Sequence, residues 1–137
     1  MSSKLGRIML VEDDPSLRLV AQIALERVGG FCVLACSSGQ AALDSIVEFA
    51  PALVLLDVMM PILDGPATLK QLRALPGYKT LPVIYLTAKI RATEISDLMA
   101  TGAIGVLAKP FDPMTLSRSV AELWNSQCRP AQLDCAP

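Results

Sequence analysis

The sequence predicts an α/β fold with one parallel β-sheet and helices on both of its faces. Short apolar runs alternate five times with segments in which apolar residues recur at helical spacing. The links between these segments are short, so we expect each strand to be joined to the next by a helix in a right-handed crossover. The central apolar run, residues 53–56, contains no polar residue, which is typical of a strand buried on both faces.

The composition limits the size, location and partners of the protein. Its 137 residues suffice for one domain with a proper core. No apolar run approaches the roughly 18 residues of a membrane helix, and the N-terminal sequence MSSKLGR lacks the apolar segment of a signal peptide. We therefore expect a cytoplasmic protein that does not bind membranes. The formal net charge of −1 supplies no general attraction for nucleic acid.

The chain contains no histidine, which excludes several kinds of chemistry. A histidine-based zinc site, a Ser-His-Asp or Cys-His catalytic pair and a phosphohistidine within the chain are all ruled out. The cysteines do not form a disulfide framework. Cys32 and Cys36 lie in one candidate strand, about 13 Å apart, and Cys128 and Cys135 lie in a polar tail. We expect reduced thiols.

The first unit consists of a strand over residues 7–11 and the helix that follows it. Asp14 and Pro15 predict the start of this helix, because an aspartate caps free backbone amides and proline fits the first helical position. Apolar residues then recur at helical spacing until Gly29 and Gly30, which end the helix.

The second and third units repeat this arrangement. A strand over residues 31–36 precedes a helix that opens at Ser38 and ends before Pro51. The central strand ends at Asp57, and the third helix starts near Asp64 and Pro66. The residues expected to face inward are Ala42, Leu43, Ile46 and Phe49 on the second helix and Leu69, Leu72 and Leu75 on the third.

The last two units complete the predicted domain, which spans residues 5–127. A fourth strand over 81–86 leads to Thr87, and a helix near 93–101 ends at Gly102. A fifth strand over 104–108 leads to Lys109, and Asp112 with Pro113 starts the last helix. Residues 128–137 have no periodicity and are expected to form a flexible tail or the start of a linker. The inward residues are Ile95, Leu98 and Met99 on the fourth helix and Leu116, Val120, Leu123 and Trp124 on the fifth.

Polar side chains follow the strands where each strand ends. They are Glu12 and Asp13 after the first strand, Asp57 at the end of the third, Thr87 after the fourth and Lys109 after the fifth. Ligands bind at this edge in open α/β sheets. Closely packed carboxylates repel one another unless a cation joins them, and Mg²⁺ suits a site of oxygen ligands without histidine or cysteine. Lys109 and Thr87 would then suit the outer oxygens of a phosphoryl group.

Each of these residues also has a simpler interpretation. Asp57 could be a turn residue and Asp13 a helix cap, whereas Thr87 could be an ordinary strand residue and Lys109 a solvated lysine. Only their shared location favours a function. The simpler interpretation is preferred for Asp14 and Asp64 as helix caps and for Trp124 as core. For Met59 and Met60, packing within the loop and a chemical role are equally open.

Six short stretches together resemble a known family. They are VEDDP (11–15), SSG (37–39), LLDVMMPILDG (55–65), LTA (86–88), TGAIG (101–105) and KPFDP (109–113). With this spacing, the chain resembles a receiver domain of two-component response regulators, of the single-domain chemotaxis type, over residues 7–127. The resemblance implies a doubly wound, flavodoxin-like sheet with strand order 2-1-3-4-5.

The resemblance also implies a phosphorylation site. Asp57 would be the phosphoacceptor, with Lys109 and Thr87 holding the phosphoryl group and the Lys109–Pro110 peptide bond in cis. The ligands of Mg²⁺ would be Glu12, Asp13, Asp57 and the backbone carbonyl of Met59. Because the chain has no histidine, the donor would be a phosphohistidine on a sensor histidine kinase or a phosphotransfer protein.

The implied partners dock at two surfaces. The donor would contact Pro15, Leu19 and Phe111. An unknown output protein would respond to a conformational change on the face formed by the fourth helix, fifth strand and fifth helix, with the chain as a monomer or weak dimer.

The chain departs from the family pattern at Val106, where an aromatic residue is usual. Lys89 and Met59 occupy positions that influence how readily water reaches the phosphoryl group.

Three interpretations of the function of the whole chain remain open. The chain is a stand-alone receiver, or it is the receiver of a larger regulator or hybrid kinase. Alternatively, it is a small phosphatase with an aspartyl nucleophile, although Met59 stands where such enzymes carry a second aspartate. The receiver interpretation predicts no enzymatic turnover beyond slow phosphorylation and dephosphorylation of the chain itself.

Overall fold

Strands and helices alternate along the chain in a computed structural model that describes residues 5–88 and 91–128. The elements are β1 (Arg7–Val11), α1 (Pro15–Ile23), η1 (Ala24–Val28), β2 (Cys32–Cys36), α2 (Gly39–Phe49), β3 (Leu53–Asp57), α3 (Gly65–Arg73), β4 (Val83–Thr87), α4 (Ala92–Ala100), β5 (Gly105–Ala108) and α5 (Leu116–Cys128). Predicted and observed strands agree within two residues at each end.

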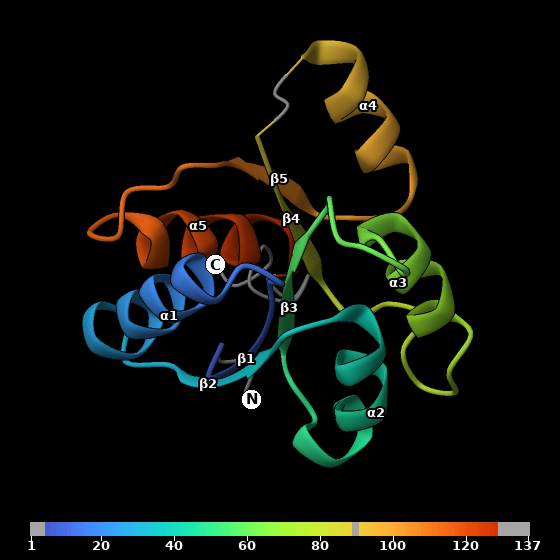
Figure 1. Ribbon diagram of the computed structural model, residues 1–137, viewed down its shortest axis with the longest axis horizontal. Coiled ribbons are helices and arrows are strands. Elements are labelled where there is room, and N and C mark those ends of the chain that lie inside the picture. Colours follow the sequence, from blue (N-terminus) through green and yellow to red (C-terminus); the bar gives the residue numbers. More distant parts are fainter. Residues whose placement is uncertain (1–4, 89–90, 129–137) are drawn as a thin grey trace, which may run out of the picture.

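The five strands form one parallel sheet in the order β2-β1-β3-β4-β5, as the resemblance implied. Figure 1 shows α1 and α5 on one face of the sheet and α2 and α3 on the other, with α4 rising beyond them. The central strand β3 is buried along its whole length. The order β1-β3-β4-β5 brings the carboxyl ends of four strands to one edge, and this arrangement positions the site.

Two hydrophobic clusters hold the helices against the sheet. The first lies under α2, α3 and α4 and includes Met9, Ile46, Leu56, Leu72, Tyr85 and Leu98. The second lies under α1 and α5 and includes Leu10, Leu25, Leu55, Ile84, Val120 and Trp124. Alternate residues of β1, β3 and β4 contribute to opposite clusters, because neighbouring side chains of a strand point to opposite faces. Burial of Trp124 confirms its predicted place in the core.

Side-chain caps start three of the helices. Asp14 accepts hydrogen bonds from the amides of Ser16 and Leu17 at 2.8 and 3.2 Å. Asp64 accepts one from the amide of Ala67 at 2.9 Å, and Ser38 caps α2 through the amide of Ala41 at 3.0 Å. These bonds satisfy amides that have no partner within the helix. The predicted caps at Asp14 and Asp64 are therefore confirmed.

The first helix ends in a wider turn than its sequence predicts. Residues 24–28 form the π-helical turn η1, in which the amide of Gly29 donates to the carbonyl of Ala24 at 3.3 Å. The same carbonyl accepts a hydrogen bond from Ser117 of α5 at 3.1 Å. A Cβ at Gly29 would lie 2.6 Å from Ser117 Oγ, so α5 packs too closely here for any larger residue. The π turn thus forms where two helices meet.

Several predicted boundaries were wrong. Strand β4 starts at Val83 instead of residue 81, because Pro82 has no amide to donate to the sheet. Strand β5 starts at Gly105, one residue after its predicted start at residue 104. The last helix starts at Leu116, because residues 113–115 form a separate turn.

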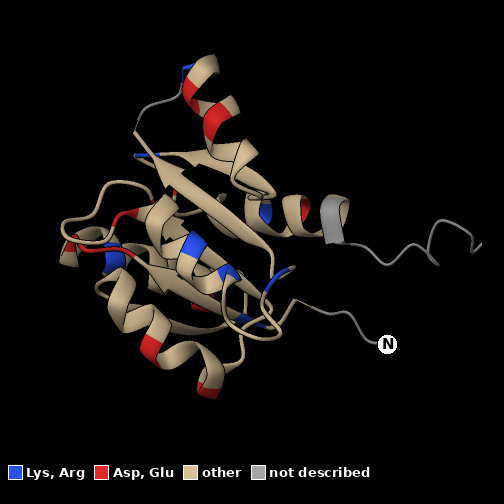
Figure 2. Cartoon of the chain, turned by 90° about the vertical axis from the view of Figure 1, so that its right-hand side faces the viewer, with Lys and Arg blue, Asp and Glu red and all other residues tan. Residues whose placement is uncertain are grey.

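The prediction that Met99 faces inward was also wrong. Its side chain is 38% exposed, and Leu98 is the residue of α4 that is buried. In Figures 1 and 2, α4 stands apart from the other helices. The helix therefore contacts the body of the protein along a narrow strip, too narrow to bury three residues of one turn.

Cys32 and Cys36 are free thiols at opposite ends of β2, as expected. Within residues 5–88 and 91–128, no helix combines the length and apolarity of a membrane span. Cys128, the first residue of the predicted tail over 128–137, is the last residue of α5. The rest of the predicted tail and Lys89 lie outside the described residues.

Candidate phosphorylation site

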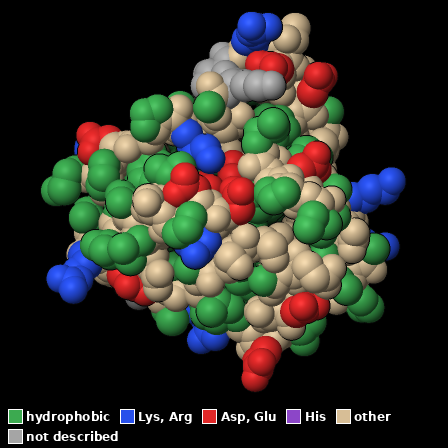
Figure 3. Space-filling view, viewed as in Figure 1, with side chains coloured by type: hydrophobic (Ala, Val, Ile, Leu, Met, Phe, Trp, Pro, Cys, Tyr) green, Lys and Arg blue, Asp and Glu red, His purple; other side chains and the backbone are tan. Residues whose placement is uncertain are grey.

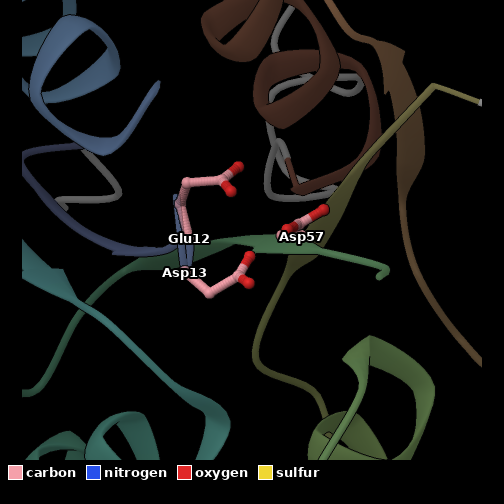
Figure 4. Close-up of side chains that lie close together, drawn as sticks. All are labelled: Glu12, Asp13 and Asp57. Carbon is pink, nitrogen blue, oxygen red and sulfur yellow. The ribbon is translucent and has the colours of Figure 1, made fainter. Parts of the chain in front are cut away.

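Three carboxylates meet at the carboxyl edge of the sheet. Glu12 and Asp13 follow β1, and Asp57 ends the neighbouring strand β3. One oxygen from each carboxylate lies within 4.8 Å of the others. Figure 3 shows acidic side chains gathered near the middle of this face with a basic one beside them, and Figure 4 shows the three carboxylates turned toward one another. The predicted convergence of these residues is confirmed.

The loop after β3 passes close behind Asp57. The amide of Gly65 donates to the carbonyl of Val58 at 2.9 Å, which brings the start of α3 back against the end of the strand. A Cβ at Gly65 would lie only 2.6 Å from the carbonyl oxygen of Asp57. Only glycine allows this close approach, and the turn holds the strand end in place.

Lys109 forms an ion pair with two of the carboxylates. Its Nζ lies 2.9 Å from Asp57 Oδ1 and 3.2 Å from Glu12 Oε1. Burial alone would lower the pKa of Lys109, but the hydrogen bond to Asp57 and the charges of Glu12 and Asp57 outweigh it, so the pKa is raised. The Lys109–Pro110 peptide bond is cis, as the resemblance implied. Lys109 therefore stays charged at the centre of the site.

Glu12 is as deeply buried as Asp57, and each has 1% of its surface exposed. Burial is the main reason that the pKa of Glu12 is raised to about 7, and the charge of Asp57 adds to the effect. The amide of Asp14, which donates to Glu12 Oε2 at 3.1 Å, and the charge of Lys109 act in the opposite direction. At neutral pH the side chain is thus poised between its neutral and charged forms.

The two oxygens of Asp57 have different surroundings. Oδ1 accepts hydrogen bonds from Lys109 and, at 3.4 Å, from the amide of Met59. Oδ2 is buried and has no hydrogen-bond partner among the described residues. A buried carboxylate oxygen is costly to leave without a partner. One oxygen is thus held in position while the other remains available to a ligand.

Thr87 and Met59 line a second part of the site. Thr87 is 2% exposed at the end of β4. Both residues border a cavity of about 230 Å³ that extends to Leu98 of α4. The two methionines of the loop differ, because Met60 is buried in the core and Met59 is exposed. Of the two interpretations left open, packing therefore describes Met60, whereas the exposed side chain of Met59 is not packed in the core.

Sequence reasoning missed one residue that supports the site. Arg18 of α1 donates from Nη1 to the carbonyl of Glu12 at 2.9 Å and to that of Asp13 at 3.4 Å. These bonds hold the backbone that carries both carboxylates. An arginine in the first turn of the helix after an acidic pair was the available signal, but nothing in the sequence shows that its side chain points back.

Comparison with known proteins identifies the family. The family model described as response regulator receiver domain matches residues 8–121. Response regulator Rre1 of Synechocystis sp. is 37% identical over 116 residues, which cover 85% of this chain and 50% of that protein. DNA-binding response regulator MtrA of Mycolicibacterium smegmatis is 36% identical over 134 residues, which cover 97% of this chain and 57% of that protein. The chain thus spans about half the length of these relatives.

A solved structure supports the same assignment. Chemotaxis protein CheY4 of Vibrio cholerae matches with a TM-score of 0.81 and 28% identity, covering 88% of this chain and 99% of that one. The family match spans the five strands except Arg7, the first residue of β1, and includes the carboxylates and Lys109. The fold, the strand order and the matched sequence agree, and the chain belongs to the response regulator receiver domain family.

Proposed function

We propose that Asp57 accepts a phosphoryl group from a phosphohistidine on a sensor histidine kinase or a phosphotransfer protein. The observation that carries the proposal is the asymmetry of the Asp57 carboxylate. Lys109 and the amide of Met59 hold Oδ1, whereas the buried Oδ2 has no hydrogen-bond partner within residues 5–88 and 91–128. An oriented carboxylate with one unpaired oxygen is suited to nucleophilic attack.

In the proposed transfer, Oδ2 of Asp57 attacks phosphorus and forms a new O–P bond. The P–N bond to the donor imidazole breaks, and the imidazole nitrogen keeps the electron pair and takes a proton from solvent. The product is an acyl phosphate on Asp57. The protein contributes position and charge and no further covalent chemistry.

The residues present fit a magnesium ion. Three carboxylates supply hard oxygen ligands within 4.8 Å of one another, and no histidine or cysteine is among them. We assign the binding of Mg²⁺ to Glu12, Asp13 and Asp57 and to the backbone carbonyl of Met59. The ion, when bound, supplies positive charge that offsets the charge on the phosphoryl oxygens.

Lys109 and Thr87 are assigned to the phosphoryl group itself. Lys109 carries a positive charge that already lies against Asp57, so it can move with little rearrangement to a phosphoryl oxygen. Thr87 offers a hydroxyl at the end of the next strand, where it can donate to the same group.

An apolar surface on α1 supports the docking of a protein donor. Leu19, Val20 and Ile23 are 57%, 40% and 46% exposed, which is unusual for apolar side chains on one helix. Figure 3 shows hydrophobic side chains over this helix, close to the acidic cluster. Pro15, at the start of α1, and Phe111, in the loop after β5, flank the site on the same face of the sheet.

The family is a signalling domain, and we propose that this chain transmits its state to a protein partner without enzymatic turnover. Residues 5–127 would form the receiver, with residues 128–137 as a tail or the start of a linker. A larger parent protein remains the alternative, because relatives such as MtrA extend well beyond the matched region. The aspartyl phosphatase remains the alternative from another class.

Phosphorylation in vitro tests the proposal. Incubation with a small phosphodonor and Mg²⁺ should add one alkali-labile phosphoryl group, and Asp57→Asn should abolish the labelling. Asp44→Asn, which changes an exposed aspartate on α2, is the matched control and should label normally. Labelling that survives Asp57→Asn would place the acceptor elsewhere. Repeated turnover of a phosphate ester by the wild-type chain would favour the phosphatase.

The metal assignment has a test of its own. Mg²⁺ should bind weakly to the unphosphorylated chain, because it gives up its water reluctantly and the site offers few protein ligands. Asp13→Ala should weaken this binding and slow the labelling together. If only one of the two changed, the metal would have no part in the transfer.

A further inference from the structure

The turn between β1 and α1 carries two of the proposed Mg²⁺ ligands. Val11 is the last residue of β1 that pairs with both neighbouring strands, and the amide of Glu12 still donates to the carbonyl of Cys36 at 3.0 Å. Asp13 is the first residue beyond these sheet contacts. Figure 4 shows the side chains of Glu12 and Asp13 extending from this turn toward Asp57. The sheet therefore fixes the backbone at Glu12 and leaves Asp13 to be held by other groups.

The two carboxylates of the turn differ in how they are held. Glu12 accepts hydrogen bonds from Lys109 at 3.2 Å and from the amide of Asp14 at 3.1 Å. Within the part of the chain that the structure describes, the Asp13 carboxylate has no hydrogen bond or ion pair. The position of the Asp13 carboxylate therefore depends on the backbone that carries it.

Arg18 of α1 reaches back to this backbone. Its Nη1 donates to the carbonyl of Glu12 at 2.9 Å and, in a longer and weaker bond, to the carbonyl of Asp13 at 3.4 Å. The amide of Arg18 donates to the carbonyl of Asp14 at 2.9 Å, so its side chain starts from the first turn of a capped helix. The half-buried guanidinium thus joins α1 to two consecutive peptide groups of the turn.

Arg18 differs from Lys109 in the groups that it binds. Lys109 bonds to carboxylate oxygens of Glu12 and Asp57, so its charge competes with a metal ion for the same ligands. Arg18 bonds to main-chain carbonyl oxygens and, within residues 5–88 and 91–128, forms no ion pair. Its charge therefore neutralises no ligand of the metal. A positively charged residue can favour a cation site in this way, because it holds the ligands in place.

Mg²⁺ makes strict demands on the positions of its ligands. It requires nearly ideal octahedral geometry at short metal–oxygen distances, whereas Ca²⁺ accepts more ligands in a more variable geometry. A small displacement of one carboxylate therefore weakens the binding of Mg²⁺ more than the binding of Ca²⁺. A change of charge near the site has no such preference, since both ions are divalent.

We propose that Arg18 is a positioning residue for the metal site. By bonding to the carbonyls of Glu12 and Asp13, it fixes the Asp13 carboxylate for Mg²⁺ and raises the preference of the site for Mg²⁺ over Ca²⁺. The inference rests on the proposed function, which assigns Mg²⁺ to these carboxylates. Removing Arg18 weakens the binding of a cation, which is opposite to the effect of removing Lys109.

Titration of the whole chain with Mg²⁺ and, separately, with Ca²⁺ tests the role of Arg18. Amide chemical shifts in NMR spectra report both affinities, because they measure weak binding without a phosphodonor. Arg18→Met removes the charge and the N–H donors and keeps most of the apolar stem. Arg27→Met, which makes the same change at an exposed position of η1, is the matched control. Urea unfolding of each variant shows whether it folds.

Arg18→Met should lower the affinity for Mg²⁺ by roughly 2- to 12-fold, as expected for the loss of one hydrogen bond. The affinity for Ca²⁺ should fall less, so that the ratio of the Mg²⁺ affinity to the Ca²⁺ affinity decreases. Arg18→Lys, which keeps the charge and can still donate to a carbonyl, should recover part of the Mg²⁺ affinity. Arg27→Met should match the wild type, and Lys109→Met should raise both affinities.

Two results would overturn the inference. One is an unchanged or higher Mg²⁺ affinity in Arg18→Met, which would mean that Arg18 acts through its charge or has no part in the site. The other is an equal fall in the affinities for Mg²⁺ and Ca²⁺, which would mean that Arg18 supports the structure of the turn without selecting the ion. If Arg18→Met does not fold, Arg18→Gln is a second neutral replacement and is judged by the same two results.

Failure of the proposed function gives a different result. It would show as absence of Asp57 labelling in the wild type with a small phosphodonor, whatever the Arg18 variants bind. A wild type that bound neither ion would overturn the metal assignment and, with it, the role of Arg18.

Discussion

Lys109 contacts only one oxygen of Asp57, at 2.9 Å, and shares its charge with Glu12 at 3.2 Å. One lysine therefore serves two buried carboxylates, and Asp13 beside them is a third acidic group. The cluster carries more negative charge than its own cation can balance. This excess is the physical reason to expect the site to attract Mg²⁺ and to bind a phosphoryl group only together with it.

Lys109→Met should strengthen Mg²⁺ binding and weaken the fold. Removing the cation leaves Glu12 and Asp57 without their shared partner, so the affinity for Mg²⁺ should rise by roughly tenfold, which is about 1.4 kcal/mol. In the absence of metal, the free energy of unfolding should fall by about 3 kcal/mol. Titration calorimetry and urea unfolding measure the two effects. Lys79→Met, at an exposed position, should change neither, and unchanged affinity in Lys109→Met would contradict the role of Lys109.

Glu12 should make the stability of the metal-free protein depend on pH. Its pKa is about 7 in the folded chain and 4.5 when unperturbed, so the folded state holds a proton that the unfolded state has lost in this interval. The contribution of Glu12 to the free energy of unfolding is fully present below pH 4.5 and is lost as the pH rises through 7. Relative to Glu12→Gln, the wild type should lose roughly 2–3 kcal/mol across this interval. Urea unfolding at several pH values measures the free energy of unfolding of both proteins. If the two free energies changed with pH in the same way, the raised pKa of Glu12 would be contradicted.

Mg²⁺ binding should show the opposite pH dependence. The ion needs the ionised form of Glu12, so its affinity should rise with pH toward 7, and binding should release a proton. Glu12→Gln should lower the affinity for Mg²⁺. It should also remove the rise of this affinity with pH that comes from the ionisation of Glu12. Calorimetry in buffers of different ionisation enthalpy counts the released protons. Binding without proton release at pH 6 would show that Glu12 is not a ligand.

Gly65→Ala should damage the site through the backbone. The added Cβ would lie 2.6 Å from the carbonyl oxygen of Asp57 and 2.9 Å from Cα of Val58, and neither atom can move without displacing the end of β3. We expect a loss of about 1–3 kcal/mol in the free energy of unfolding and slower labelling of Asp57. At Gly6 a Cβ would meet nothing within 4 Å, so Gly6→Ala is the matched control. Equal stability of the two variants would contradict this account.

Features that depend on local sequence could be predicted, as the caps at Asp14 and Asp64 show. The convergence of Asp57 with Lys109 depends on strand order, which only the resemblance to the family supplied. The contacts of Arg18 could not be predicted, because helix periodicity does not show where a long side chain turns. The hydrogen bond between the hydroxyls of Tyr85 in β4 and Thr101 at the end of α4 joins separate elements and needs the packed structure. The error at Met99 has the same origin, since the pattern does not show how narrow the contact of α4 is.

Val106→Ala should leave the phosphorylation response largely intact. Val106 is partly buried against the cluster that contains Tyr85, and valine is too short and too stiff about its first torsion to switch between buried and exposed positions. A conformational change still requires a group that interacts differently with the phosphorylated state, and the candidates are Thr87 and the helix that follows it. Removing two methyl groups from a partly buried side chain should cost about 1 kcal/mol of stability. Amide hydrogen exchange with and without beryllofluoride and Mg²⁺ as a phosphoryl mimic should show changes over residues 87–99 in both the wild type and Val106→Ala. If the mimic changed amide exchange around Val106 and left α4 unchanged, the signal would leave the site through β5 instead.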